Sequence, residues 1–175
     1  MLTVIMECRD QEPELAQTLA VLVAGAIDGL VSDVVVLDHG SSDGTARLAE
    51  AAGCRFYRQW SMAEILNAAR GDWILLVEPG ARPQNGWIEE ICEYVASSRK
   101  PAQFSASRLH RRPFLKRIGR RPPLEQGLLM TKGEALAAAT AGGDLDHIAR
   151  GRKAQRLSSE LVPSWVARQN RRPTA

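Results

Sequence analysis

The sequence predicts one α/β domain, in which a mostly parallel sheet is flanked by helices. Short apolar runs alternate with helical patterns over the first ninety residues, the order that parallel strands with helical crossovers require. The chain has 175 residues, 45% hydrophobic and 25% charged, which suits a globular protein with a substantial core. We therefore expect a single domain, with any ligand at the carboxyl ends of its strands.

The predicted strands are short runs rich in apolar and β-branched residues. In the first half of the chain they cover residues 2–6, 34–37, 55–57 and 73–77. The pattern is weaker in the second half, where we expect strands at 102–107, 127–131 and 157–162.

Helical patterns fill the intervals between these strands. A first helix begins near Pro13, and Gly25 and Gly29 are expected to end it. Asp43 is expected to cap a second helix that Gly53 ends. Further helices are expected at residues 61–69 and from 83 or 85 to 95. Another is expected after the strand at 127–131, extending to about residue 141, and a short one at 144–150. The tail at 166–175 is expected to fray.

Charge is divided unevenly between the two halves of the chain. Residues 1–90 contain 14 acidic and 6 basic side chains, a net charge of −8, and residues 91–175 contain 6 acidic and 17 basic, a net of +11. Residues 99–121 alone hold nine Lys or Arg and no acid. Such a segment is expected to meet an anion, which could be a phosphate-bearing substrate, an anionic membrane surface or nucleic acid, or to be a solvated basic loop. Nucleic acid is disfavoured, because the basic loop at residues 108–123 has Phe114 as its only Phe, Tyr or Trp to stack on a base.

The chain ends and cysteines favour a soluble cytoplasmic protein. The N-terminus lacks a basic region before its apolar run, so no signal peptide is expected. No run reaches the ~18 apolar residues of a membrane span. The three cysteines, Cys8, Cys54 and Cys92, have no paired spacing and are expected to be reduced thiols.

One motif points to a family. Residues 34–45 read VVVLDHGSSDGT and resemble the strand followed by D-D-G-S-x-D-x-T in glycosyltransferase family 2, whose members have a GT-A fold. Residues 65–72, ILNAARGD, resemble the approach to that family's metal strand, and residues 73–81, WILLVEPGA, stand where that strand ends in D-x-D. The resemblance covers residues 2–98, and within the family the chain is similar to short bacterial members. It implies a GT-A-like, Rossmann-like sheet that binds a nucleotide-diphospho-sugar.

The resemblance also implies which residues touch the donor. Asp38 would accept hydrogen bonds from the base or ribose, unless it only caps its own turn, and Gly40 would allow the backbone conformation of that turn. Arg9, directly after the first strand, departs from the family's residue types there; it could pair with a phosphate instead, or be only a solvent-exposed side chain. Asn67 stands in the family's substrate-binding segment.

The metal motif departs from the family pattern at its acids. Glu78 takes the place of the first acid, and Gly80 stands where the second acid is expected. In metal-dependent members this pair of carboxylates binds Mg2+ or Mn2+, which offsets the charge of the leaving diphosphate. We therefore expect weak cation binding through Glu78, or none.

The catalytic base and the acceptor side are the least defined. Asp144 and Asp146 come nearest to the family's base position, although Asp144 could be only a helix cap. Arg111 and Arg112 could neutralise the diphosphate if their loop folds over the site.

Together these features predict a glycosyltransferase with an unknown acceptor. Residues 1–98 would be its nucleotide-sugar-binding half and residues 99–165 its basic, acceptor-side half. The protein would be cytoplasmic, with residues 99–121 able to place it on the membrane surface. The alternative is a catalytically degenerate protein of the same fold that binds a nucleotide or a protein partner.

Overall fold

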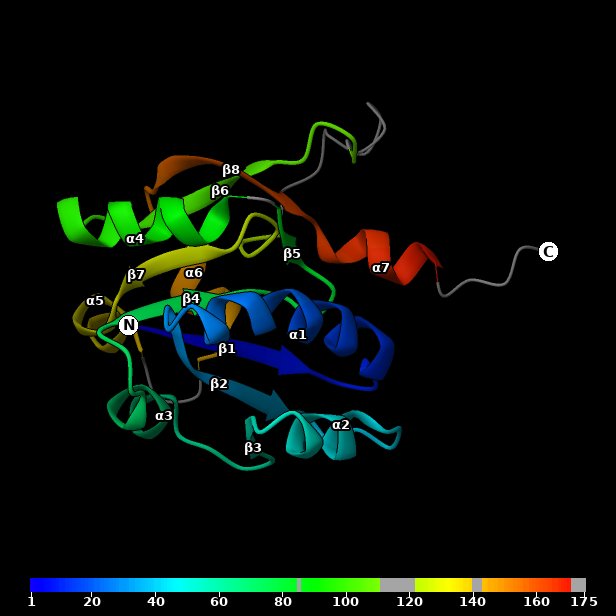
Figure 1. The fold of residues 1–175 in the computed structure, drawn as a ribbon. Coiled ribbons are helices and arrows are strands. Elements are labelled where there is room, and N and C mark those ends of the chain that lie inside the picture. The colour runs from blue at the N-terminus through cyan, green and yellow to red at the C-terminus, as the bar shows by residue number, and fades with distance from the viewer. Residues whose placement is uncertain (85, 111–121, 140–142, 171–175) are drawn as a thin grey trace.

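The computed structural model describes residues 1–84, 86–110, 122–139 and 143–170. They form a single α/β domain around one mixed sheet of eight strands in the order β3-β2-β1-β4-β7-β6-β8-β5 (Figure 1). The strands are β1 (Leu2–Cys8), β2 (Val31–Asp38), β3 (Arg55–Tyr57), β4 (Trp73–Leu76), β5 (Arg82–Pro83), β6 (Ala102–Ala106), β7 (Leu128–Thr131) and β8 (Gln155–Val162). The predicted fold class is confirmed.

The sheet has a parallel and a mixed half. Strands β3, β2, β1 and β4 are parallel neighbours. Strand β7 runs antiparallel to both β4 and β6, whereas β8 is parallel to β6 and antiparallel to β5. The parallel half agrees with the expected β–α alternation, because a helix connects each of its strands to the next along the chain.

Helices cover both faces of the sheet. They are α1 (Glu12–Ile27), α2 (Thr45–Ala51), α3 (Met62–Ala68), α4 (Trp87–Ser97), α5 (Lys132–Ala138), α6 (Leu145–Ala149) and α7 (Ser164–Asn170). Helices α1, α2 and α4 pack on one apolar layer and α3, α5 and α6 on the other. Successive residues of β1 show the division, because Val4 and Met6 join the first layer and Ile5 joins the second.

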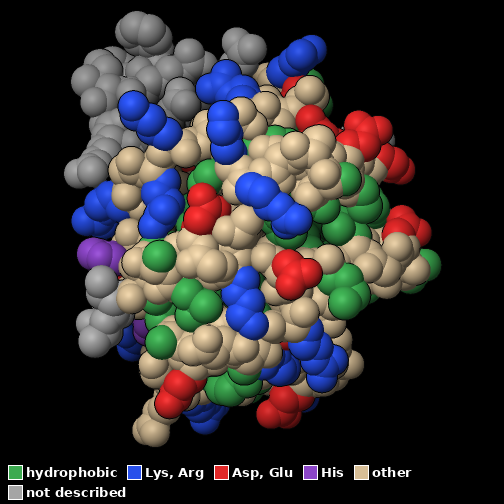
Figure 2. All heavy atoms as spheres, turned by 90° about the vertical axis from the view of Figure 1, so that its left-hand side faces the viewer, with side chains coloured by type: hydrophobic (Ala, Val, Ile, Leu, Met, Phe, Trp, Pro, Cys, Tyr) green, Lys and Arg blue, Asp and Glu red, His purple; other side chains and the backbone are tan. Residues whose placement is uncertain are grey.

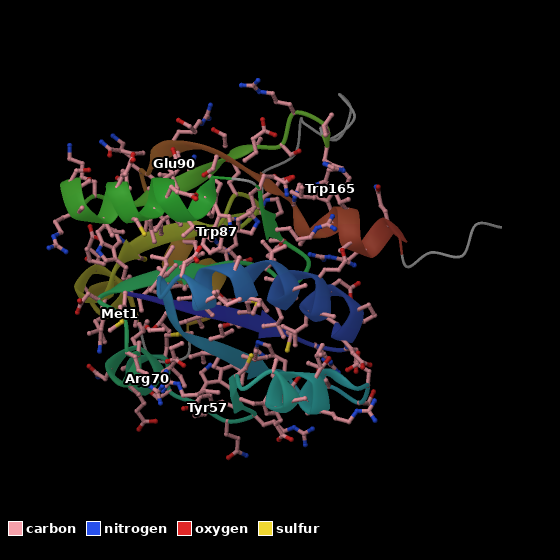
Figure 3. The ribbon with its side chains drawn as sticks, viewed as in Figure 1. Met1, Tyr57, Arg70, Trp87, Glu90 and Trp165 are labelled. Atoms are coloured by element: carbon pink, nitrogen blue, oxygen red, sulfur yellow. The ribbon has the colours of Figure 1, made fainter. Side chains whose placement is uncertain are left out.

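Two of the expected helix ends are corrected. Gly25 was expected to end the first helix, yet α1 continues to Ile27 and Gly29 follows with a φ of +75°. Gly25 lies inside α1 because Trp87 packs over it: a Cβ there would lie 2.7 Å from the indole ring. Figure 3 shows Trp87 on α4, facing α1. The N-cap of α2 is Gly44 and not Asp43. The Asp43 carboxylate accepts the N–H groups of Thr45 and Glu12 at 3.0 Å each.

The C-terminal segment is also corrected. Residues 166–170 were expected to fray, but they belong to α7, in which Val166 and Ala167 are buried against the domain. Residues 171–175 lie outside the described residues. Strand β5, which the sequence did not indicate, pairs Arg82 with Val162. This pairing brings the start of α7 to the loop after β4.

No helix among the described residues has both the length and the apolarity needed to cross a membrane. The face in Figure 2 contains the amino ends of the parallel strands, and it carries basic and acidic side chains interspersed.

Gly71→Ala tests the close approach between β1 and the turn before β4. A Cβ at Gly71 would lie 2.6 Å from both the Met1 carbonyl oxygen and the Thr3 nitrogen, which are backbone atoms of the sheet. We expect the substitution to lower the free energy of unfolding by about 1–3 kcal/mol, measured by urea denaturation. Gly133→Ala is the matched control, because no atom lies within 4 Å of its Cβ position and alanine favours the helix. Equal stability of the two variants would contradict the packing described.

Candidate functional site

The carboxyl ends of β1, β2 and β4 meet at one edge of the sheet, on the right in Figure 1. Cys8 pairs in register with Asp38, and Val77 follows β4 beside Ile5 through a 3.3 Å hydrogen bond to its carbonyl. The turns after these strands therefore form one continuous rim. Ligands of open α/β sheets bind at this edge.

Asp38 organises the turn after β2. Its carboxylate is fully buried and accepts the backbone N–H of Ser41 at 3.0 and 3.1 Å, together with the Ser41 hydroxyl. The Nε of Arg58, a largely exposed residue after β3, lies 3.4 Å from Asp38 Oδ2. Gly40 has a φ of +85°, which a side chain would disfavour. The turn is thus held open toward solvent by a carboxylate at its base.

A second loop locks onto this turn from the end of β1. The Asp10 N–H donates to Ser41 Oγ at 2.8 Å, and Asp10 Oδ1 accepts the Ser42 N–H at 2.7 Å. These hydrogen bonds from Ser42 lower the pKa of Asp10. Arg9 stands beside this junction with its side chain exposed. This places an exposed positive charge beside the junction.

The loop after β4 carries the remaining acid of the expected metal motif. Glu78 Oε2 accepts the Ser164 hydroxyl, and the Arg168 Nη2 lies 3.3 Å from the same oxygen. Both partners are on α7. The loop is also fixed to α1, because the buried Thr18 hydroxyl accepts the Gly80 N–H at 2.8 Å and donates to the Ala81 carbonyl at 2.9 Å. Glu78 therefore sits in a rigid, partly neutralised setting.

A divalent cation does not fit the side chains at this position. Gly80 has a φ of +94°, and a Cβ there would lie 2.9 Å from Ala167 Cβ and 3.1 Å from the Ser164 carbonyl oxygen. Helix α7 thus occupies the space that a second acid would need. Glu78, the one acid of the motif, is already paired with a guanidinium. Over the described ranges, no three His, Cys, Asp or Glu side chains are arranged to hold a metal ion.

Further carboxylates gather where α6 meets the rim. Glu7 Oε1 accepts the Leu145 N–H at 3.0 Å, and Glu7 Oε2 lies 3.4 Å from His39 Nε2. Burial raises the pKa of Glu7. Glu7, from β1, thereby anchors the first turn of α6 to the carboxyl edge.

Asp144 and Asp146 have different settings on that helix. Asp144 is exposed and caps α6 by accepting the His147 N–H at 2.7 Å, which agrees with the capping alternative. Asp146 is half-buried. Burial raises its pKa above the ordinary 3.8, and the nearby charges of Glu78 and Asp144 raise it further. The geometry thus brings Asp146 into the field of Glu78, although 68 residues separate them in the sequence.

One expected substrate contact, Asn67, lies away from this rim. Asn67 is exposed near the end of α3, and its carbonyl accepts the Lys132 ammonium at 2.8 Å. Because α3 runs back toward the start of β4, this places Asn67 at the amino edge; Figure 3 shows nearby Arg70 there, on the same side as Met1. Arg111 and Arg112 lie outside the described residues.

The cysteines offer no nucleophile at this rim. All three are free thiols, as expected. Cys8 is buried, and desolvation together with the charge of Asp38 raises its pKa to about 12. A thiol in that environment stays protonated and unreactive.

Four site residues were missed from the sequence: Glu7, Arg58, Ser164 and Arg168. The sequence could have identified Glu7, because it is an acid directly after the apolar run at residues 2–6 that predicts a buried strand. Ser164 and Arg168 had none, since their position depends on the pairing of β8 with β5.

No protein-family model matches the sequence, and no curated protein matches it. Solved structures do match in fold. Glucosyl-3-phosphoglycerate synthase from Mycobacterium tuberculosis superposes with a TM-score of 0.60 at 17% identity, over 89% of this chain and 69% of that one.

The same enzyme in complex with Mn2+, UDP and glucosyl-3-phosphoglycerate matches with a TM-score of 0.55 at 18% identity, over 77% of this chain. Mannosyl-3-phosphoglycerate synthase from Rubrobacter xylanophilus matches with a TM-score of 0.55 at 14% identity, also over 77% of this chain. This chain spans 58% and 54% of those two structures. At such identities the likeness shows a GT-A-like fold.

Gly80→Asp, which restores the second acid, tests whether α7 fills that position. We expect it to lower the free energy of unfolding by about 2–5 kcal/mol, from left-handed backbone strain and overpacking against Ala167. Urea denaturation measures the loss. Gly29→Asp is the control, because its φ is +75° but no atom lies within 4 Å of its Cβ position, so it carries only the strain. Mn2+ should not stabilise Gly80→Asp; a variant as stable as the control and further stabilised by Mn2+ would show that a cation site can form there.

Proposed function

We propose that this chain binds a nucleotide-diphospho-sugar at the carboxyl edge of its sheet and transfers the sugar to an acceptor. The observation that carries the proposal is the convergence of the Asp38 turn, the Glu78 loop and the half-buried Asp146 on one rim. The fold neighbours crystallised with UDP support it. Membership of glycosyltransferase family 2, as a bacterial and cytoplasmic protein, is part of the same proposal.

The donor nucleoside would lie over the turn after β2. Asp38 is fully buried, so a base or ribose donor that reaches its carboxylate takes the place of Arg58 Nε. The exposed Arg58 and Arg9 side chains can then move onto the ligand. Gly40 lets the backbone approach closely, because no atom lies within 4 Å of its Cβ position.

Asp146 would deprotonate the acceptor hydroxyl. A general base needs a pKa near its working pH, and the settings that raise a carboxylate pKa are burial and neighbouring like charge. Asp146 has both, whereas Asp144 is exposed and engaged as a helix cap. We therefore assign the base to Asp146 and a structural role to Asp144.

The charge of the diphosphate is not assigned to a metal. Neighbours of the same fold were crystallised with Mn2+ or Mg2+, and Glu78 is the residue that would hold such a cation here. The described side chains do not fit such a cation, because α7 fills the position of the second acid and Glu78 is paired with Arg168. Basic groups are the alternative source of positive charge.

A phosphate-bearing acceptor is the first class to test. A neighbour was crystallised with phosphoglyceric acid, and residues 99–121 carry nine basic side chains to meet an anion. Contact of that segment with an anionic membrane surface is the other use proposed for it.

The second candidate is a binding module that keeps the fold without turnover. The close packing of α7 on Gly80 favours it, because that packing leaves the expected metal motif incomplete. Nucleotide binding without release of UDP from any sugar donor would distinguish it from a transferase.

Asp38→Asn tests donor binding. We expect calorimetric affinity for UDP or GDP to fall by about 10-fold or more, because a carboxylate that accepts charged hydrogen bonds is lost. Asp33→Asn is the matched control: it lies on the same strand, paired with Arg55 at 2.6 Å, but at the opposite end. Equal losses in both variants would place the nucleotide elsewhere.

Asp146→Asn tests the base. We expect UDP release from UDP-glucose with phosphoglyceric acid to fall by about 10²- to 10⁴-fold, with UDP affinity retained. Asp144→Asn is the control, since asparagine caps a helix as well as aspartate. Retained activity in Asp146→Asn and a loss in Asp144→Asn would reverse the assignment.

The raised pKa of Asp146 predicts how kcat/KM depends on pH. The base works only when deprotonated, so the raised pKa of Asp146 puts the acid limb of kcat/KM above pH 3.8. Glu78→Gln removes a neighbouring negative charge and should move this limb, and the carboxyl NMR titration of Asp146, to lower pH. An unmoved titration would show that the two carboxylates do not interact.

A further inference from the structure

The guanidinium of Arg168 stands where the incomplete metal motif lacks positive charge. We infer that Arg168 binds the diphosphate of the nucleotide donor in place of a divalent cation, so that the donor binds without metal. This inference rests on the proposed function and identifies the residue that meets the diphosphate.

One nitrogen of the Arg168 guanidinium contacts the protein. Arg168 Nη2 lies 3.3 Å from Glu78 Oε2 and 2.8 Å from Ser164 Oγ. These contacts use one nitrogen of a group with five N–H donors. The Arg168 side chain is 50% exposed while Glu78 is 24% exposed. One end of the guanidinium is therefore held by the protein while the group as a whole remains accessible to a ligand.

Helix α7, which carries Arg168, is fixed in position by its neighbours. Helix α7 begins two residues after β8, whose end is paired with β5. Helix α7 contacts α1, and its buried Ala167 packs against the Gly80 position. Because Thr18 fixes the Gly80 loop from the other side, Glu78 and Arg168 are positioned by the same framework.

The acidic groups at this position call for a positive charge if a diphosphate is to bind there. Glu78 and Asp146 are close enough for their charges to interact, so a diphosphate arriving beside them would be repelled. Arg168 neutralises Glu78 and offers the planar donor fork that matches phosphate oxygens. A metal-holding site needs uncommitted acids, whereas here the acid is committed to the arginine.

The chemistry of transfer is then balanced without a cation. The bond between the sugar and the diphosphate oxygen breaks, and the acceptor oxygen forms the new bond to the sugar. The acceptor proton goes to Asp146. The electron pair stays on the diphosphate, where Arg168 meets the added negative charge.

Calorimetric titration of the full chain with UDP and with uridine, in EDTA and in Mn2+, tests the inference. Wild-type protein should bind UDP equally with and without Mn2+. Arg168→Gln should weaken UDP binding in EDTA by roughly 10- to 100-fold and leave uridine binding unchanged, because uridine has no diphosphate. Arg156→Gln, an exposed arginine near the start of β8, is the matched control and should change neither.

Each other outcome overturns a defined part. UDP binding that requires Mn2+ overturns the inference alone, as does Arg168→Gln with unchanged UDP affinity. Equal loss of UDP and uridine binding shows a merely structural role for Arg168 and also overturns it. Failure of the wild-type protein to bind UDP, GDP or uridine under either condition overturns the proposed function, and this inference with it. Thermal unfolding of each variant verifies that it is folded.

Discussion

The antiparallel pairing of β5 with the end of β8 is the constraint on which the site depends. Strand β5 follows the Glu78 loop after a single turn, and α7 follows β8 almost at once. Strand β5 and the end of β8, about eighty residues apart in the sequence, thereby lie side by side. The first residues of α7 are consequently packed against the Glu78 loop. The contact of Ser164 and Arg168 with Glu78 is a consequence of topology, and the glycine at position 80 is the condition that lets it form.

The same closure changes the electrostatics of the rim. A carboxylate beside a second, half-buried carboxylate is costly unless a positive charge lies near. Arg168 supplies that charge to Glu78 from within the chain. Burial raises the pKa of Asp146, and the charges of Glu78 and Asp144 raise it further. The basic second half of the sequence and its acidic first half therefore meet at this point. Folding places the two kinds of charge within contact distance.

The sequence was sufficient for the parallel half of the fold because local signals determine it. Apolar runs, glycine stops such as Gly53, and the turn after Asp38 all act within a few residues of the chain. Gly25 was misjudged because its reason is tertiary: Trp87 fills the space that a side chain would need. Asn67 was placed with the substrate by its motif, although the direction of its helix carries it to the other edge. Arg168 was invisible, since only the register of β8 determines its partner.

The incomplete acid motif does not by itself mean that catalysis is lost. Asp146 is half-buried, and burial raises its pKa, with a further contribution from neighbouring carboxylates. Such a group lowers stability and adds no affinity for an anion, whereas the proposed transfer would use it as the acceptor of a proton. The charge of Glu78 acts on Asp146, and Glu78 is itself paired with Arg168. In the proposed transfer, Asp146 would accept the proton of the acceptor hydroxyl and Arg168 would supply the positive charge that the diphosphate needs.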